Sequence, residues 1–132
     1  MRYVLDADVV IGALDAHDAH HKQSRRLLTG WHTQQDSLLI SLPNLSEVLV
    51  APAADEARLR VARAAIAALG VASHRPNEAI AVNAARIRGQ HPVSLPDAYL
   101  LATARHLDAQ VASYDARLLR AARVETIATA TT

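Results

Sequence analysis

The sequence contains no cysteine and no phenylalanine. The absence of cysteine excludes disulfide frameworks, thiolate nucleophiles and cysteine-based zinc or iron–sulfur sites, so any bound metal must be held by oxygen or imidazole. Aromatic residues reach only 3% while apolar residues make up 51% of the chain. The core must therefore be built from Ala, Val, Leu and Ile, a composition that suits helices packed on a parallel sheet.

Long apolar runs and a strong charge of either sign are also missing. No stretch approaches the length of a membrane span, and the first residues lack the features of a signal peptide, so we expect a cytoplasmic protein with no membrane partner. The net charge of +1 does not mark a nucleic-acid binder, although thirteen of the fourteen basic residues are Arg, which suits forked phosphate contacts. A chain of 132 residues fits a single domain over residues 1–132.

Short apolar runs alternate with helix-spaced apolar residues along the whole chain. Gly30 and Gly70 are predicted to stop helices, Pro52 to close one, and Ser94 to cap one. The expected strands are 3–5, 37–41, 71–74, 110–114 and 124–127, and the expected helices are 9–14, 20–31, 43–52, 56–69, 76–89, 95–107 and 115–122. This alternation predicts an α/β three-layer sandwich, with a central, mostly parallel five-stranded sheet and helices on both faces.

Four carboxylates stand at points where such a fold could collect them. Asp6 follows the first expected strand, Glu47 comes soon after the second and Asp115 follows the fourth, while Asp97 opens the helix before the fourth. A doubly wound topology places its ligand site beyond the carboxyl ends of the strands. Two ionised carboxylates about 4 Å apart would repel by roughly 4 kcal/mol at an effective dielectric near 20, so a cation or protonation must relieve the cluster.

Helix capping is the competing interpretation for each acid taken alone, because a carboxylate in the first turn complements the helix dipole. Capping does not require acids at successive sheet-edge turns, nor Asp6 and Asp8 flanking one residue. The joint pattern therefore favours an oxygen-only site for Mg²⁺ or Mn²⁺, which could activate water against a phosphodiester.

The order and spacing of four short motifs resemble the PIN-domain family, and in particular the VapC-type toxins of bacterial toxin–antitoxin pairs. The resemblance covers essentially the whole chain. The matching pieces are Val4-Leu5-Asp6-Ala7-Asp8-Val9-Val10, Asn44-Leu45-Ser46-Glu47-Val48-Leu49, Leu95-Pro96-Asp97-Ala98 with Ala102 beyond it, and Ser113-Tyr114-Asp115.

The resemblance implies a metal-dependent endoribonuclease in which Asp6, Glu47, Asp97 and Asp115 are the catalytic, metal-binding acids and Ser113 orients ligands. Asp6 and Asp97 would hold the principal ion, and attacking water would leave a 5′-phosphate and a 3′-hydroxyl. It also implies an RNA substrate, a homodimer and a cognate antitoxin that blocks the acidic cleft. One departure is Asp8, because the family usually has Asn, Ser or Thr at that position; Asp8 could join the metal shell or raise local repulsion.

Three other interpretations of the sequence stay open. A ribonuclease without metal could use His17, His20 and His21, of which His17 and His21 would share a helix face at zinc-binding spacing. A phosphatase of the haloacid-dehalogenase type could use Asp6 and Asp8, but it needs a late lysine and the chain has only Lys22. A catalytically weak PIN-like RNA-binding or regulatory module is the third.

Phosphate contacts could come from a set of arginines on the expected helices, and the competing interpretation of these residues is a solvated helix face. They are Arg25, Arg26, Arg58, Arg60, Arg63, Arg86 and Arg88.

Overall fold

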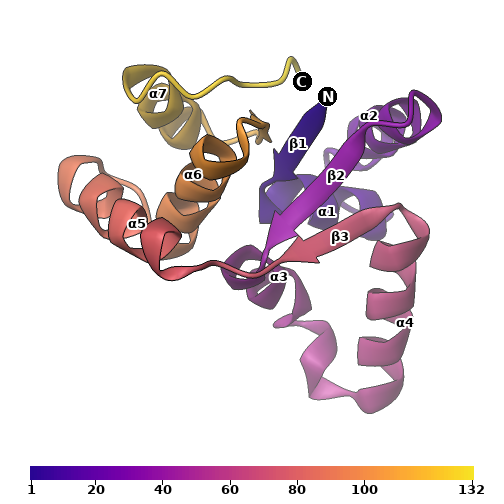
Figure 1. Ribbon diagram of the computed structural model, residues 1–132. Helices are drawn as coiled ribbons and strands as arrows, with labels where there is room; N and C mark the ends of the chain where they lie inside the picture. The colour runs from indigo at the N-terminus through magenta and orange to yellow at the C-terminus, as the bar shows by residue number, and fades with distance from the viewer.

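The computed structural model describes residues 1–132 and contains one four-stranded parallel sheet in the order β3-β2-β1-β4 (Figure 1). The strands are β1 (Arg2–Leu5), β2 (Ser37–Ser41), β3 (Val71–His74) and β4 (Gln110–Ala112). The helices are α1 (Ala7–Leu14), α2 (His21–Thr33), α3 (Leu42–Leu49), the 3-10 turn η1 (Pro52–Ala54), α4 (Glu56–Ala68), α5 (Glu78–Gln90), α6 (Leu95–Leu107) and α7 (Ala116–Val124). None of these helices is long and apolar enough to cross a membrane.

The order of the strands reverses once, between β1 and β4. The chain adds β2 and β3 on one side of β1, and β4 then pairs with the other side, Val4 lying opposite Val111 in the register. Figure 1 shows the arrowheads of β1, β2 and β3 pointing away from the end of the molecule where the two termini lie. The residues that follow β1 and β4 therefore emerge together at the topological switch point, where parallel α/β sheets place their ligand sites.

Two apolar cores lie on opposite faces of the sheet, because successive strand side chains point in opposite directions. Val4 and Val111 pack with α5, α6 and α7, whereas Tyr3, Leu5 and Ala112 pack with residues of α1, α2, α3 and α4. Figure 1 shows α5, α6 and α7 gathered on one side of β1 and α4 beyond β3 on the other. The expected three-layer arrangement of helices on both faces is present.

The fifth strand predicted over residues 124–127 is wrong. Val124 ends α7 with a side chain 72% exposed, and Thr126 takes a left-handed backbone (φ 59°) that a β-branched residue rarely adopts. Beyond β4, the only sheet-like pairing is an isolated bridge between Val111 and Thr129. The apolar residues at this point belong to the end of the amphipathic helix α7 and to Ile127, whose side chain is buried in the core.

Gly30 does not stop α2, which continues through it to Thr33, and the left-handed residue that follows the helix is Gln35 (φ 62°). Gly70 does follow α4 as predicted, with a φ of 79° that favours glycine. The predicted fourth strand also ends early, at Ala112 rather than at residue 114. This early end frees the backbone of the next three residues for the site.

Candidate functional site

Asp6 is the most buried acid at the switch point, with only 6% of its surface exposed. It occupies the N-cap position of α1, but its side chain makes no capping hydrogen bond. Instead the Ser113 hydroxyl donates to Asp6 Oδ2 at 2.6 Å, and the Asp115 backbone N–H donates to Ser113 Oγ at 2.9 Å. The capping interpretation therefore fails for Asp6, whose carboxylate is tied to the segment after β4.

The pKa of Asp6 is raised from 3.8 to about 7, chiefly by burial and then by repulsion from Asp8. Asp97 adds a smaller repulsion, and the hydrogen bond from Ser113 opposes the rise. An acid in this state holds a proton at neutral pH or requires a nearby positive charge.

Asp8 lies on the first turn of α1 and faces the same segment. The Tyr114 backbone N–H donates to Asp8 Oδ2 at 3.1 Å, while Asp8 Oδ1 is buried and has no hydrogen-bond partner. Burial raises the pKa of Asp8, hydrogen bonds from the backbone lower it, and repulsion from Asp115 raises it. A buried carboxylate oxygen without a donor is costly, so this atom is free to accept a proton donor or a cation.

Glu47 and Asp97 approach the cluster from α3 and α6. Asn44, which is fully buried, donates from Nδ2 to Glu47 Oε1 at 3.1 Å. Partial burial raises the pKa of Glu47, and repulsion from Asp97 contributes in the same direction. Burial likewise raises the pKa of Asp97, against hydrogen bonds from Ser94, and Asp115 adds repulsion.

Asp115 is the acid that does cap a helix. Its Oδ1 accepts the backbone N–H of Arg117 at 2.9 Å at the start of α7. The same residue repels both Asp8 and Asp97, so it lies within electrostatic range of the cluster. Capping and membership of the acidic site are therefore compatible for Asp115.

These interactions join all five acids predicted from the sequence into one electrostatic cluster. Each is coupled to at least one other: Asp6 to Asp8 and Asp97, Asp97 to Glu47 and Asp115, and Asp115 to Asp8. An all-oxygen donor set in which Asp6, Asp8, Glu47 and Asp97 have raised pKa values, and in which one carboxylate oxygen has no partner, suits a hard divalent cation. No three histidine or acidic side chains come together in this structure as a group that could hold a metal ion. The chemistry of the oxygen donors is that of Mg²⁺ ligands, since this ion takes one or two carboxylates and keeps several waters.

Sequence reasoning missed the residues that hold the acids in place. Asn44 supports Glu47 from three residues earlier on α3, a helical spacing that could have been recognised. Tyr114 supports Asp8 through its backbone, and its hydroxyl contacts the hydroxyl of buried Ser24 on α2 at 2.7 Å. This second contact joins residues ninety positions apart, and no local pattern in the sequence signals it.

The histidines do not form the zinc-type pair considered from the sequence. α2 begins at His21, so His17 lies before the helix and the two residues do not share a helix face. The ring nitrogen Nδ1 of His21 is 2.8 Å from the carbonyl oxygen of Gly12, and the ring of His20 lies against Tyr114.

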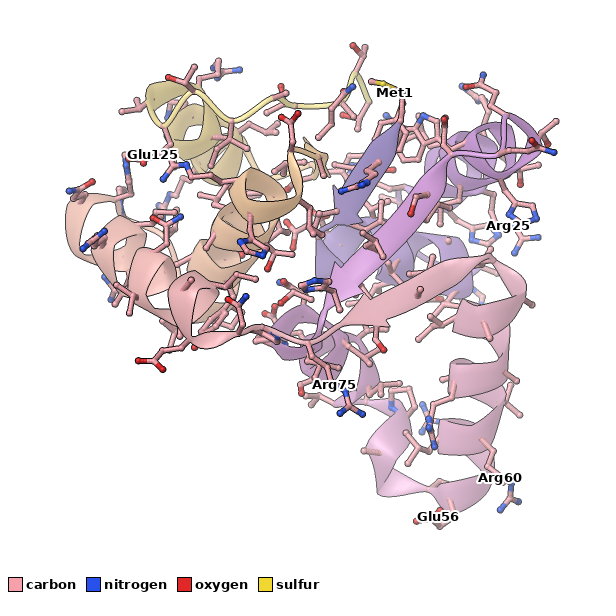
Figure 2. The ribbon with its side chains drawn as sticks, in the orientation of Figure 1. Met1, Arg25, Glu56, Arg60, Arg75 and Glu125 are labelled. Atoms are coloured by element: carbon pink, nitrogen blue, oxygen red, sulfur yellow. The ribbon has the colours of Figure 1, made fainter.

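The arginines proposed as phosphate contacts are all exposed, and they are spread over α2, α4 and α5 rather than forming one patch. In Figure 2, Arg25 projects near α2 and Arg60 lies close to Glu56 at the opposite end of α4 from the sheet. Arg58 lines, with Glu47, an apolar groove of about 610 Å³ between α1, α3, η1 and α4.

Comparison with known proteins gives one family and a consistent fold. The family model described as the PIN domain matches residues 3–124. The fold is similar to VapC20 of Mycobacterium tuberculosis, described as a sarcin–ricin loop cleaving toxin (18% identity, 90% of this chain and 94% of that one, TM-score 0.71). It is similar to a chain of VapBC-1 from nontypeable Haemophilus influenzae (17% identity, 98% of this chain and 97% of that one, TM-score 0.73). It is also similar to a chain of VapBC2 from Rickettsia felis bound to a promoter DNA fragment (12% identity, 98% of this chain and 98% of that one, TM-score 0.74). No curated protein sequence matches.

Proposed function

Because the chain belongs to the PIN-domain family, we propose that it is a metal-dependent endoribonuclease and the toxin of a VapBC-type toxin–antitoxin pair. The observation that carries the proposal is the cluster of five acids at the switch point of the sheet, centred on buried Asp6. Such a cluster destabilises the folded protein, since each ionised acid makes ionisation of the next one less favourable. A bound divalent cation would relieve this repulsion and could act on the phosphate of a nucleic acid.

In this proposal Asp6 and Asp97 hold the principal ion, Mg²⁺ or Mn²⁺. Glu47, kept in place by Asn44, and Asp115 complete the site or position the attacking water. The ion, when bound, would stabilise charge on the phosphate and favour ionisation of water. Ser113 keeps the Asp6 carboxylate aimed at the site through its 2.6 Å hydrogen bond.

Cleavage of labelled RNA by the purified protein tests the activity. We expect cleavage in Mg²⁺ or Mn²⁺, none in excess EDTA, and products that carry a 5′-phosphate. Asp6→Asn and Asp97→Asn should each reduce the rate by at least a hundredfold, because each removes a charged group that acts on the reacting centre. Glu56→Gln is the matched control, since Glu56 is an exposed acid at the far end of α4 (Figure 2). Equal cleavage in EDTA, or by the Asp6→Asn protein, would contradict the proposal.

We propose a small antitoxin protein as partner. Support comes from the structures with similar folds, which include complexes described as VapBC and as a toxin–antitoxin complex from Klebsiella pneumoniae. The apolar groove that Glu47 helps to line offers a protein segment a binding surface beside this acid. Expression of this chain alone should arrest growth, and co-expression with the product of a short upstream reading frame should relieve the arrest. Growth at the normal rate without any partner would argue against a toxin.

A homodimer and a cytoplasmic location also belong to the proposal, as the family resemblance implies them. Light scattering of the purified protein tests the first, and fractionation of the producing cells tests the second.

A PIN-like RNA-binding module with weak catalysis is the second candidate, and Asp8 is the feature that favours it. One oxygen of Asp8 is engaged by the Tyr114 backbone and the other has no donor, so this extra charge could disturb the ion. A single-turnover assay in Mn²⁺ separates the two functions. Binding without cleavage by the wild type, together with cleavage by Asp8→Asn, would favour the weak module.

A further inference from the structure

One aromatic pair of the chain lies beside the acid cluster rather than in the core. The imidazole ring of His20 stacks on the ring of Tyr114, with the centroids 4.0 Å apart and the planes inclined by 11°. The other stacked pair, Tyr3 and Trp31, is buried in the core between α2 and the sheet. The His20 side chain is 46% exposed. Because one face of its ring is covered by Tyr114, this exposure belongs to the opposite face and the ring edge.

Two hydrogen bonds of Tyr114 and the close approach of α1 to α2 hold this residue in place. The Tyr114 hydroxyl is 2.7 Å from Ser24 Oγ, and Ser24 is fully buried. The Tyr114 backbone donates to Asp8. Gly12 allows α1 and α2 to approach closely at this point, since a Cβ at residue 12 would lie 2.6 Å from Ser24 Oγ. The ring of Tyr114 is therefore a rigid support.

His20 lies in the segment between α1 and α2, which is held by hydrogen bonds of its own. The His20 backbone N–H donates to Asp18 Oδ1 at 2.8 Å, and the His17 backbone N–H donates to Asp15 Oδ1 at 2.9 Å. A ring held in this way loses little conformational freedom when a ligand binds. The position is close to the chemistry, because Tyr114 stands between Ser113 and Asp115 in the sequence and His20 favours the ionised form of Asp8.

We propose that the exposed face of His20 is a stacking site for an unpaired nucleobase of the RNA, next to the phosphate on which the acid cluster acts. This inference rests on the proposed ribonuclease function, and it names a part of the RNA substrate, an unpaired base, that the protein binds. Every base has a flat face that stacks on an aromatic ring, so the site is tolerant of sequence. A base in a duplex is already stacked on its neighbours, so the site prefers loops, bulges and single strands.

The alternative role for the pair is structural, with His20 only closing the α1–α2 connection over Tyr114. The two roles differ in what replaces the imidazole. A stacking site accepts His20→Phe, which keeps a flat ring, and is lost in His20→Ala. A purely structural contact leaves RNA binding unchanged in both variants as long as the protein stays folded.

The probe is a short single-stranded RNA that carries 2-aminopurine, whose fluorescence is quenched when the base stacks. Binding is measured in EDTA, so that no cleavage occurs, with the same RNA as a duplex for comparison. We expect His20→Ala to weaken binding of the single strand by about five- to tenfold and to reduce the quenching, in line with the loss of one base–ring stack. His20→Phe should match the wild type, and so should His17→Ala, an exposed histidine of the same connection.

Unchanged binding and quenching by His20→Ala would overturn the stacking site, and so would an equal loss in His20→Phe, which would point to imidazole chemistry instead. Cleavage of the same RNA in Mn²⁺ is measured in parallel. If the wild type cleaves the RNA and His20→Ala does not change binding, the stacking site alone is refuted. If stacking depends on His20 but the wild type does not cleave the RNA, the nuclease function alone is refuted. If the wild type neither binds nor cleaves the RNA, both proposals are refuted.

Discussion

Replacing Asp6 by asparagine should stabilise the metal-free protein at high pH. The folded-state pKa of Asp6 is raised from 3.8 to about 7, chiefly by burial. An acid whose pKa is higher in the folded state does not lower the free energy of unfolding below its unfolded pKa, because it is protonated in both states. As the pH rises toward the folded pKa, the unfolded state loses its proton first and the protein becomes less stable. Asparagine does not ionise, so the variant keeps this stability.

The size of the effect follows from the shift. A change from 3.8 to about 7, at 1.36 kcal/mol for each pKa unit, corresponds to about 4 kcal/mol of unfolding free energy. No discount for solvent screening is needed, because Asp6 is only 6% exposed. The difference between Asp6→Asn and the wild type should therefore grow from near zero at about pH 4 to about 4 kcal/mol above pH 7, or roughly 10–15 °C in melting temperature for a chain of this size.

Urea denaturation in EDTA at a series of pH values measures the difference. The fluorescence of Trp31, the only tryptophan, reports unfolding because its side chain is 8% exposed and stacks on Tyr3. Mg²⁺ or Mn²⁺ should stabilise the wild type and narrow the gap, since a ligand that binds only the folded state stabilises it. A gap between Asp6→Asn and the wild type that stays constant from pH 4 to pH 8, or a wild type that is the more stable protein at pH 8 in EDTA, would refute the reasoning.

Two further predictions concern the residues around the acids. Ser113→Ala removes the 2.6 Å hydrogen bond to Asp6 and should raise the pKa of that acid further, so the activity should need a higher pH, as a pH–rate profile would show; an unshifted profile would contradict this role. Gly12→Ala should lower stability by about 1–3 kcal/mol, because the new Cβ would lie 2.6 Å from Ser24 Oγ, and a urea midpoint equal to that of the wild type would contradict the close approach.

Much of the fold could be predicted from local signals. The second and third strands have the predicted bounds, because Gly70 ends one helix and the apolar runs are short and well separated. Two of the errors fall where a residue takes an unusual backbone. Gln35 and Thr126 adopt left-handed conformations without being glycine, so the end of α2 was placed too early and a strand was predicted where the chain turns after α7.

The acids of the candidate site could be predicted because Asp6, Asp97 and Asp115 stand at or near helix starts that parallel topology brings together, and Glu47 lies on the short helix after β2. Apart from Asn44, which lies three residues before Glu47, their contacts could not be predicted, because they join residues distant in the sequence. The Tyr114–Ser24 contact and the Ser113–Asp6 hydrogen bond both span about a hundred residues. The sequence also could not distinguish the acid that caps its helix, Asp115, from the acid that does not, Asp6.

The last residues of the chain have a consequence for handling the protein. Ala130 donates to the carbonyl of Val111 at 2.8 Å, and the carbonyl of Ala128 accepts from the backbone N–H of Val111 at 2.9 Å, so the tail covers the outer edge of β4. An uncovered strand edge is a template for pairing with other chains. Shortening the C-terminus, or pulling it away with a bulky fusion, would expose that edge and invite aggregation, so affinity tags belong at the N-terminus.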